Sequence, residues 1–116
     1  LRNFMTVKNS IAAVPYATFD TATLTANFQL VNGTGLPRAC FLLRLMNSSA
    51  VDIIISYDGV TNHDLIVSAS INTFPFQSNS QPQNNAALIA LGTKIWVKQR
   101  TGAAAGAFVI AGYYQI

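Results

Sequence analysis

Residues 39–59 have the sequence ACFLLRLMNSSAVDIIISYDG, and this stretch decides the fold. Residues 39–46 are apolar except for Arg44, and such a run predicts a strand that is buried on both faces. Residues 51–57 are rich in valine and isoleucine, whose β-branched side chains favour a strand over a helix. An Asn-Ser-Ser turn separates the two segments, and the closing Asp-Gly pair is a hairpin-type turn signal. The stretch therefore predicts two consecutive strands with no room for a helix.

Short apolar segments separated by Gly, Asn, Ser and Pro continue on both sides of this stretch. We expect further strands at 65–67, 71–76, 93–100 and 107–116, with a long uncharged polar loop at 77–85. Turn signals recur at roughly 8–12 residues, a spacing typical of sandwiches and barrels. The sequence thus predicts an all-β fold, a single antiparallel β-sandwich of jelly-roll type with seven or eight strands.

The 116 residues are enough for one domain and one core. Residues 1–11 are mixed in character and predict an extended N-terminal arm, which leaves 12–116 as the β-sandwich domain. Within that domain, residues 12–19 are expected to form an edge element. Pro15 has no backbone N–H and cannot donate a hydrogen bond on a central strand.

Charge is scarce in this chain. Only 9% of the residues are charged, against about 25% in an ordinary soluble domain, and there is no Glu. Such a surface is weakly protected by charge repulsion, so a free monomer should tend to associate. A chain packed permanently against neighbours has less need of that protection, although a free monomer with a mildly polar surface stays open. The formal net charge of +3 does not by itself indicate nucleic acid or membrane.

The remaining composition excludes several classes of protein. Cys40 is the single cysteine, so no intramolecular disulfide is possible, and its apolar surroundings predict a buried, inert thiol. No stretch of about 18 apolar residues predicts a membrane span. The first residues lack the apolar core of a signal peptide, so we expect nothing that directs export.

Asp58, His63 and Asp64 are the residues that suggest an enzyme. One histidine and two carboxylates close in sequence can bind a divalent metal or form an acid–base pair. Turn chemistry explains the same residues, and no nucleophile motif, phosphate-binding glycine loop or paired Glu accompanies them. We therefore expect no catalytic residue, no metal and no cofactor.

The segment at 94–100 carries the more informative pattern. Alternation places Ile95 and Val97 inward and puts four residues on the opposite face, namely Lys94, Trp96, Lys98 and Arg100. An aromatic ring among cations suits a protein interface, where Trp and Arg are enriched. It also suits a sugar ring or single-stranded nucleic acid, although nucleic acid is unlikely because the chain has no second basic cluster. A plain solvent face is the fourth possibility.

The order of segments 47–59, 92–98 and 106–114, with a polar Asn/Gln-rich loop before the second, resembles the small β-sandwich virion proteins of tailed bacteriophages. These include capsid decoration (cement) proteins, head-fibre bases and small tail or adaptor proteins. The resemblance covers residues 39–116. It implies a non-enzymatic structural protein, assembled in the host cytoplasm and located in the virion. It also implies a homo-oligomer, with a trimer favoured, that binds the major capsid protein or another virion protein.

Capsid decoration that stabilises the major shell is the function expected from this resemblance. The alternatives are a minor tail, adaptor or head-fibre component, or a module that binds glycan or single-stranded nucleic acid through Trp96. The expected contact residues are the four on the 94–100 face and three on the arm, namely Arg2, Phe4 and Lys8.

Overall fold

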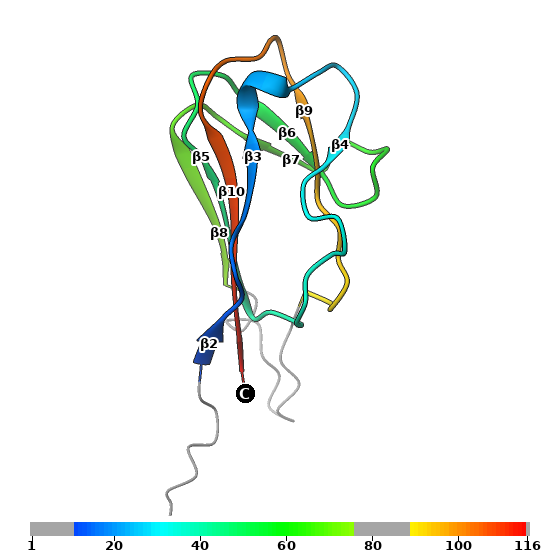
Figure 1. The fold of residues 1–116 in the computed structure, drawn as a ribbon, viewed down its shortest axis with the longest axis vertical. Helices are drawn as coiled ribbons and strands as arrows, with labels where there is room; N and C mark the ends of the chain where they lie inside the picture. The colour runs from blue at the N-terminus through cyan, green and yellow to red at the C-terminus, as the bar shows by residue number, and fades with distance from the viewer. Residues whose placement is uncertain (1–10, 76–88, 116) are drawn as a thin grey trace, which may run out of the picture.

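The structure is a computed structural model that describes residues 11–75 and 89–115. Its strands pair antiparallel in two facing sheets (Figure 1). The five-stranded sheet contains β2 (Ile11–Ala13), β3 (Ala17–Asp20), β10 (Ala107–Gln115), β5 (Leu42–Asn47) and β8 (Ser70–Pro75). The four-stranded sheet contains β4 (Gln29–Leu30), β9 (Trp96–Gln99), β6 (Ile53–Ser56) and β7 (Asp64–Ile66). One 3-10 turn, η1 (Thr21–Thr23), follows β3.

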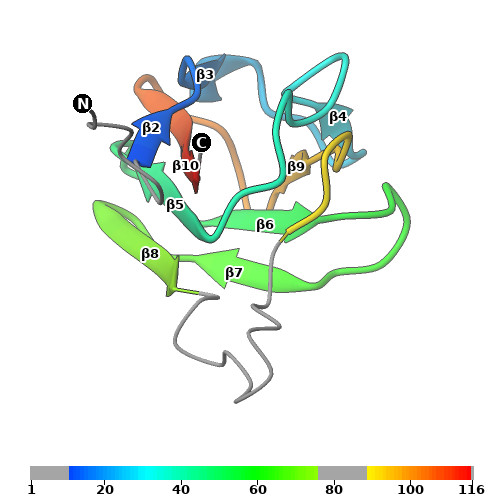
Figure 2. The same ribbon diagram turned by 90° about the horizontal axis from the view of Figure 1, so that it is seen from below.

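The topology is that of a jelly roll. Early strands pair with late ones in a nested order, β3 with β10, β4 with β9, β5 with β8, and β6 with β7. The chain is thus one long hairpin, wound into two sheets, whose tip is the loop between β6 and β7. Figure 2 shows the two sheets around the core, with β7 and β8 as neighbours at one corner. The predicted fold class is confirmed.

Nine strands are described, against seven or eight expected, because one edge strand is divided. Both β2 and β3 pair with β10, at successive positions along the same edge. Val14, Pro15 and Tyr16 separate them, so Pro15 lies on an edge, where its missing N–H costs no ladder bond. The nine strands therefore occupy eight positions. Residues 1–10 of the predicted arm and the predicted loop at 77–85 lie outside the described residues.

The prediction of a strand buried on both faces at 39–46 is wrong. Strand β5 begins at Leu42, and only alternate side chains are fully covered, with Leu43 and Leu45 at 0% exposure. Leu42, Arg44 and Met46 lie half-buried on the outer face. In a two-layer sandwich each sheet has one partner sheet, so one face of every strand faces outward. Before β5, Cys40 forms an isolated bridge with Ile89.

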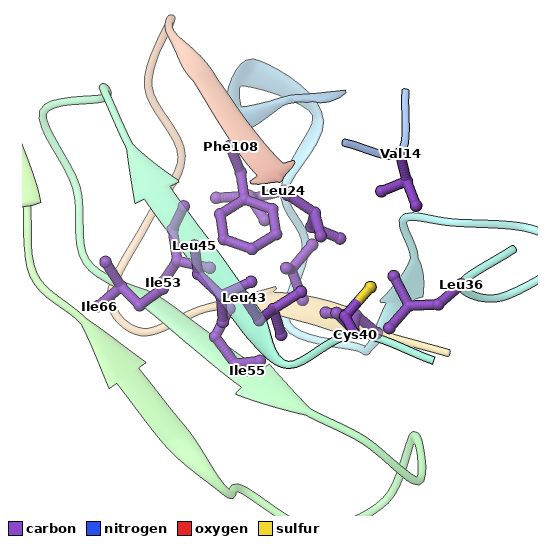
Figure 3. Packing of buried hydrophobic residues seen from close by; sticks show 13 residues of the cluster. Val14, Leu24, Leu36, Cys40, Leu43, Leu45, Ile53, Ile55, Ile66 and Phe108 are labelled. Atoms are coloured by element: carbon purple, nitrogen blue, oxygen red, sulfur yellow. The ribbon is translucent and has the colours of Figure 1, made fainter. Parts of the chain in front are cut away.

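The core fills the space between the sheets (Figure 3). Phe108 from β10 points towards β5 and β6, and Ile110 of the same strand is 2% exposed. The inward positions predicted at Ile95 and Val97 are confirmed, each with 0% exposure. Each such side chain contributes about 1.5–3 kcal/mol when fully buried. Cys40 is buried at 0% exposure, as expected, and burial raises the pKa of its thiol.

Asn47 ties the sheets together at one end of the sandwich. Its side-chain N–H groups donate to the carbonyl oxygens of Val51, Ile66 and Val67 at 2.8–3.2 Å. Its Oδ1 accepts from the backbone N–H and the hydroxyl of Ser49, at 3.0 and 2.6 Å. This buried amide therefore joins β5, the loop after it and the end of β7.

At the opposite end, the loop after β4 and the loop before β9 are joined by hydrogen bonds. The Asn32 side chain donates to the Thr93 carbonyl at 3.0 Å and accepts from the Ile95 N–H at 2.7 Å. The Gly92 N–H donates to the Leu36 carbonyl at 2.7 Å. Gly35 has φ +82°, and a Cβ on it would lie 2.3 Å from the Gly92 oxygen. Only glycine fits there.

Replacing Gly35 with Ala should lower the free energy of unfolding by about 3 kcal/mol, because both the backbone conformation and the clash oppose a methyl group. Gly33→Ala is the matched control, since a Cβ at Gly33 meets nothing within 4 Å. Urea unfolding of both variants measures the difference. Equal midpoints for the two variants would contradict the close contact of these two loops.

Candidate functional site

The predicted basic face is built on β9, which is shorter than the sequence suggested. Trp96 and Lys98 point outward from the strand, while Lys94 and Arg100 lie exposed just beyond its two ends. The strand does not extend back to Lys94 because the Ile95 N–H is taken by the Asn32 side chain. The structure therefore brings Trp96 and Lys98 together on the four-stranded sheet and leaves the other two at the margins.

Two of the three cations on this face have partners. Arg100 Nη1 lies 2.9 Å from Asp52 Oδ2, and the Ser68 N–H donates to Asp52 Oδ1 at 3.0 Å. The Ser68 N–H and the Arg100 guanidinium hold the pKa of Asp52 below its usual value. Lys98 Nζ lies 4.6 Å from the centre of the Phe28 ring, a cation–π contact. This pairing makes the face less basic than its sequence suggests.

Trp96 is half-buried in the middle of the face. Its cross-strand neighbours are Leu30 on β4 and Ser56 on β6. Gly59, with φ +78°, lies against the indole, since a Cβ built on it would be 3.1 Å from Trp96 Cε2. The loop after β6 thus covers part of the ring, and the remainder forms an apolar centre with Leu30, which is 37% exposed.

The arm residues Arg2, Phe4 and Lys8 lie outside the described residues, so their predicted part in a contact stays a prediction.

Asp58, His63 and Asp64, in and beside the loop between β6 and β7, make hydrogen bonds that hold this loop in shape. Asp58 Oδ1 accepts from the Ser56 hydroxyl and from the N–H groups of Val60 and Thr61, each at 2.8 Å. These bonds hold the pKa of Asp58 well below its usual range. Asp64 Oδ2 accepts from the Tyr57 hydroxyl at 2.7 Å. Within 11–75 and 89–115, no three His, Cys, Asp or Glu side chains are grouped to hold a metal ion.

A second surface was missed by sequence reasoning. The outward residues of β5, β8 and β10 are mostly apolar, and Val109, Met46 and Ile71 form one continuous row across these strands. Tyr113 and Leu42 stand side by side in another row. Arg44 is the only charged outward residue on these three strands as described. The apolar run at 39–46, interrupted only by Arg44, was the available signal, and it was taken for burial on both faces.

Comparison with solved structures found a similar fold in one chain. The chain is similar to a chain of the Bacillus endospore appendages, which form a family of disulfide-linked pili. The likeness has a TM-score of 0.50 at 13% sequence identity and covers 100% of this chain and 97% of that one. No protein-family profile matches the sequence, and no curated protein matches it. The likeness supports the β-rich fold.

Two further findings concern the cysteine and the described helical residues of this chain. Cys40 is the only cysteine of the 116 residues and is fully buried, so linking folded copies through its sulfur would require opening the core. No helix in the described part is long and apolar enough to cross a membrane.

Gly59→Ala should shift the loop off Trp96, because the added methyl group would lie only 3.1 Å from Trp96 Cε2 and the φ of +78° disfavours alanine. We expect the fluorescence of Trp96, the only tryptophan, to shift to longer wavelength and to be quenched more strongly by acrylamide. Gly33→Ala serves again as the control. An unchanged spectrum in Gly59→Ala would show that the loop does not cover the ring.

Proposed function

We propose that the protein is a structural subunit of a multi-copy assembly and that its working part is its outer surface. The observation that carries this proposal is the apolar outer face of the five-stranded sheet, made by the outward residues of β5, β8 and β10. The outer face of an antiparallel sheet is usually polar, because it meets water. Here Ile71 is 56% exposed, and Met46 and Val109 continue the apolar row beside it.

The low charge of the chain supports the same proposal. With 9% charged residues and a net charge of +3, little repulsion keeps copies apart. Several polar side chains of the described loops and strand ends are occupied by internal hydrogen bonds, as Asn32, Asn47 and Asp58 illustrate. Burial of the apolar face against a neighbour is the largest favourable change available to this surface.

The fold likeness adds support of a general kind, since the similar chain belongs to appendages that form pili. A pilus-like filament and a virion shell both consist of repeated subunits. Capsid decoration, with the major capsid protein as partner and a trimer as the unit, is the specific form that we propose from the sequence resemblance. In either setting the Trp96 face would serve as a second contact, with Leu30 and Trp96 at its centre and Lys94 at its rim.

Charge placed on the outer face should abolish assembly. We expect the wild-type protein to sediment as a multi-copy species and Met46→Lys with Val109→Lys to sediment as a folded monomer, because two adjacent lysines cannot be buried without partners. Asn62→Lys with Ala105→Lys adds the same charge at exposed loop positions and should leave assembly intact. Sedimentation velocity measures mass, and circular dichroism confirms folding.

A wild-type protein that stays monomeric at high concentration, and gains no mass with added particles, would contradict the proposal. Unchanged assembly of the Met46→Lys, Val109→Lys variant would remove the outer face as the contact.

A further inference from the structure

The tip loop between β6 and β7 is closed by a hydrogen bond that needs a neutral histidine. The Tyr57 N–H donates to His63 Nδ1 at 3.0 Å. The backbone N–H of His63 donates to the Ile55 carbonyl at 2.9 Å, and the centroids of the Tyr57 and His63 rings lie 5.4 Å apart. A ring nitrogen that accepts a hydrogen bond carries no proton. The closed loop therefore holds a neutral imidazole whose proton is on Nε2.

This loop is also the cover of Trp96. Gly59 stands near the middle of the loop and rests on the indole, with its would-be Cβ 3.1–3.4 Å from three ring atoms. The Tyr57–His63 hydrogen bond ties the start of the loop to its end, while the Gly59 N–H donates to Ser56 Oγ at 2.9 Å. Loss of the Tyr57–His63 bond would free the turn that carries Gly59 at one end and let it shift away from Trp96 as a unit. The ring atoms beneath it would then meet water or a partner.

Four other ionisable groups surround the imidazole. Asp58 Oδ2 lies 3.9 Å from His63 Nε2, Asp64 accepts from the Tyr57 hydroxyl, and Arg100 lines the same shallow hollow as His63 and Asp64. Carboxylates and guanidinium groups ordinarily keep their charge between pH 5 and 8. Burial and the neighbouring Asp64 raise the pKa of Tyr57, so its hydroxyl stays a donor. The imidazole is the group in this set whose charge ordinarily changes in that range.

We propose that protonation of His63 releases the tip loop and uncovers Trp96, which makes the loop a proton-sensitive cover. A proton on Nδ1 faces the Tyr57 N–H, so two donors meet and the closing hydrogen bond is lost. Asp58 attracts the imidazolium and opposes release. Its carboxylate is half exposed and 3.9 Å away, and a solvent-screened pair of this kind adds little stability.

The direction of the pH effect follows from the protonation state in which His63 closes the loop. The neutral imidazole makes the bond, so closure is favoured while the ring is neutral and is lost when falling pH adds a proton to it. The inference stands on the geometry of the loop and does not depend on the proposed assembly. If Trp96 does serve as a contact, acid would change the surface offered to the partner.

Acrylamide quenching of Trp96 between pH 8 and pH 5 tests this directly on the full chain. We expect the quenching constant to rise as the pH falls through the range in which an imidazole gains its second proton. His63→Gln is the matched variant, because its side-chain oxygen accepts a hydrogen bond but does not titrate, and its quenching should stay flat. Asp58→Asn keeps an acceptor and removes the charge, so the midpoint should move to lower pH.

The amide signal of Tyr57, followed by NMR over the same range, should shift together with the His63 ring and with the quenching constant. Flat quenching in the wild type while the His63 ring titrates would overturn the proposal. So would an equal rise in His63→Gln, or a change at Trp96 with no change at the Tyr57 amide.

Discussion

The pairing of β10 with strands on both of its edges holds this molecule together. Along one edge β10 meets β2 and β3, and along the other it meets β5, so residues 107–115 join both ends of the described chain. The same strand supplies Phe108 and Ile110 to the core. Such pairings connect residues far apart in sequence, and their loop-closure cost must be met by the apolar burial that they complete. The five-stranded sheet depends on that closure, since β10 pairs with three of its other strands.

The sequence predicted the class of fold because period-two alternation and turn residues are local signals. Ile95 and Val97 were assigned inward correctly for this reason. The side on which a strand is covered is not local, and the run at 39–46 was misjudged because apolar outward residues look the same as buried ones. The shortening of β9 could not be predicted either, since Asn32, more than sixty residues away, takes the N–H of Ile95.

The candidate site, like the fold, was predicted where the signal is local and missed where it depends on distant residues. Alternation placed Trp96 and Lys98 on one face correctly, but the partners that reduce the basic character of this face come from distant segments. Arg100 pairs with Asp52 and Lys98 lies over Phe28, and neither contact follows from the residues around β9. The polar residues that suggested chemistry mostly stabilise loops. The outward residues of β5, β8 and β10, as described, are mostly apolar with Arg44 as the one charge, and the proposed structural role rests on this surface.

Quantitative mass spectrometry of particles and filaments purified from the source is the most direct test of the central claim. The account predicts that this chain is present in many copies, in a fixed ratio to a shell or filament protein, or is itself the main component. Recovery of the chain only as a free monomer in the soluble fraction, with none in any particle or filament, would contradict it.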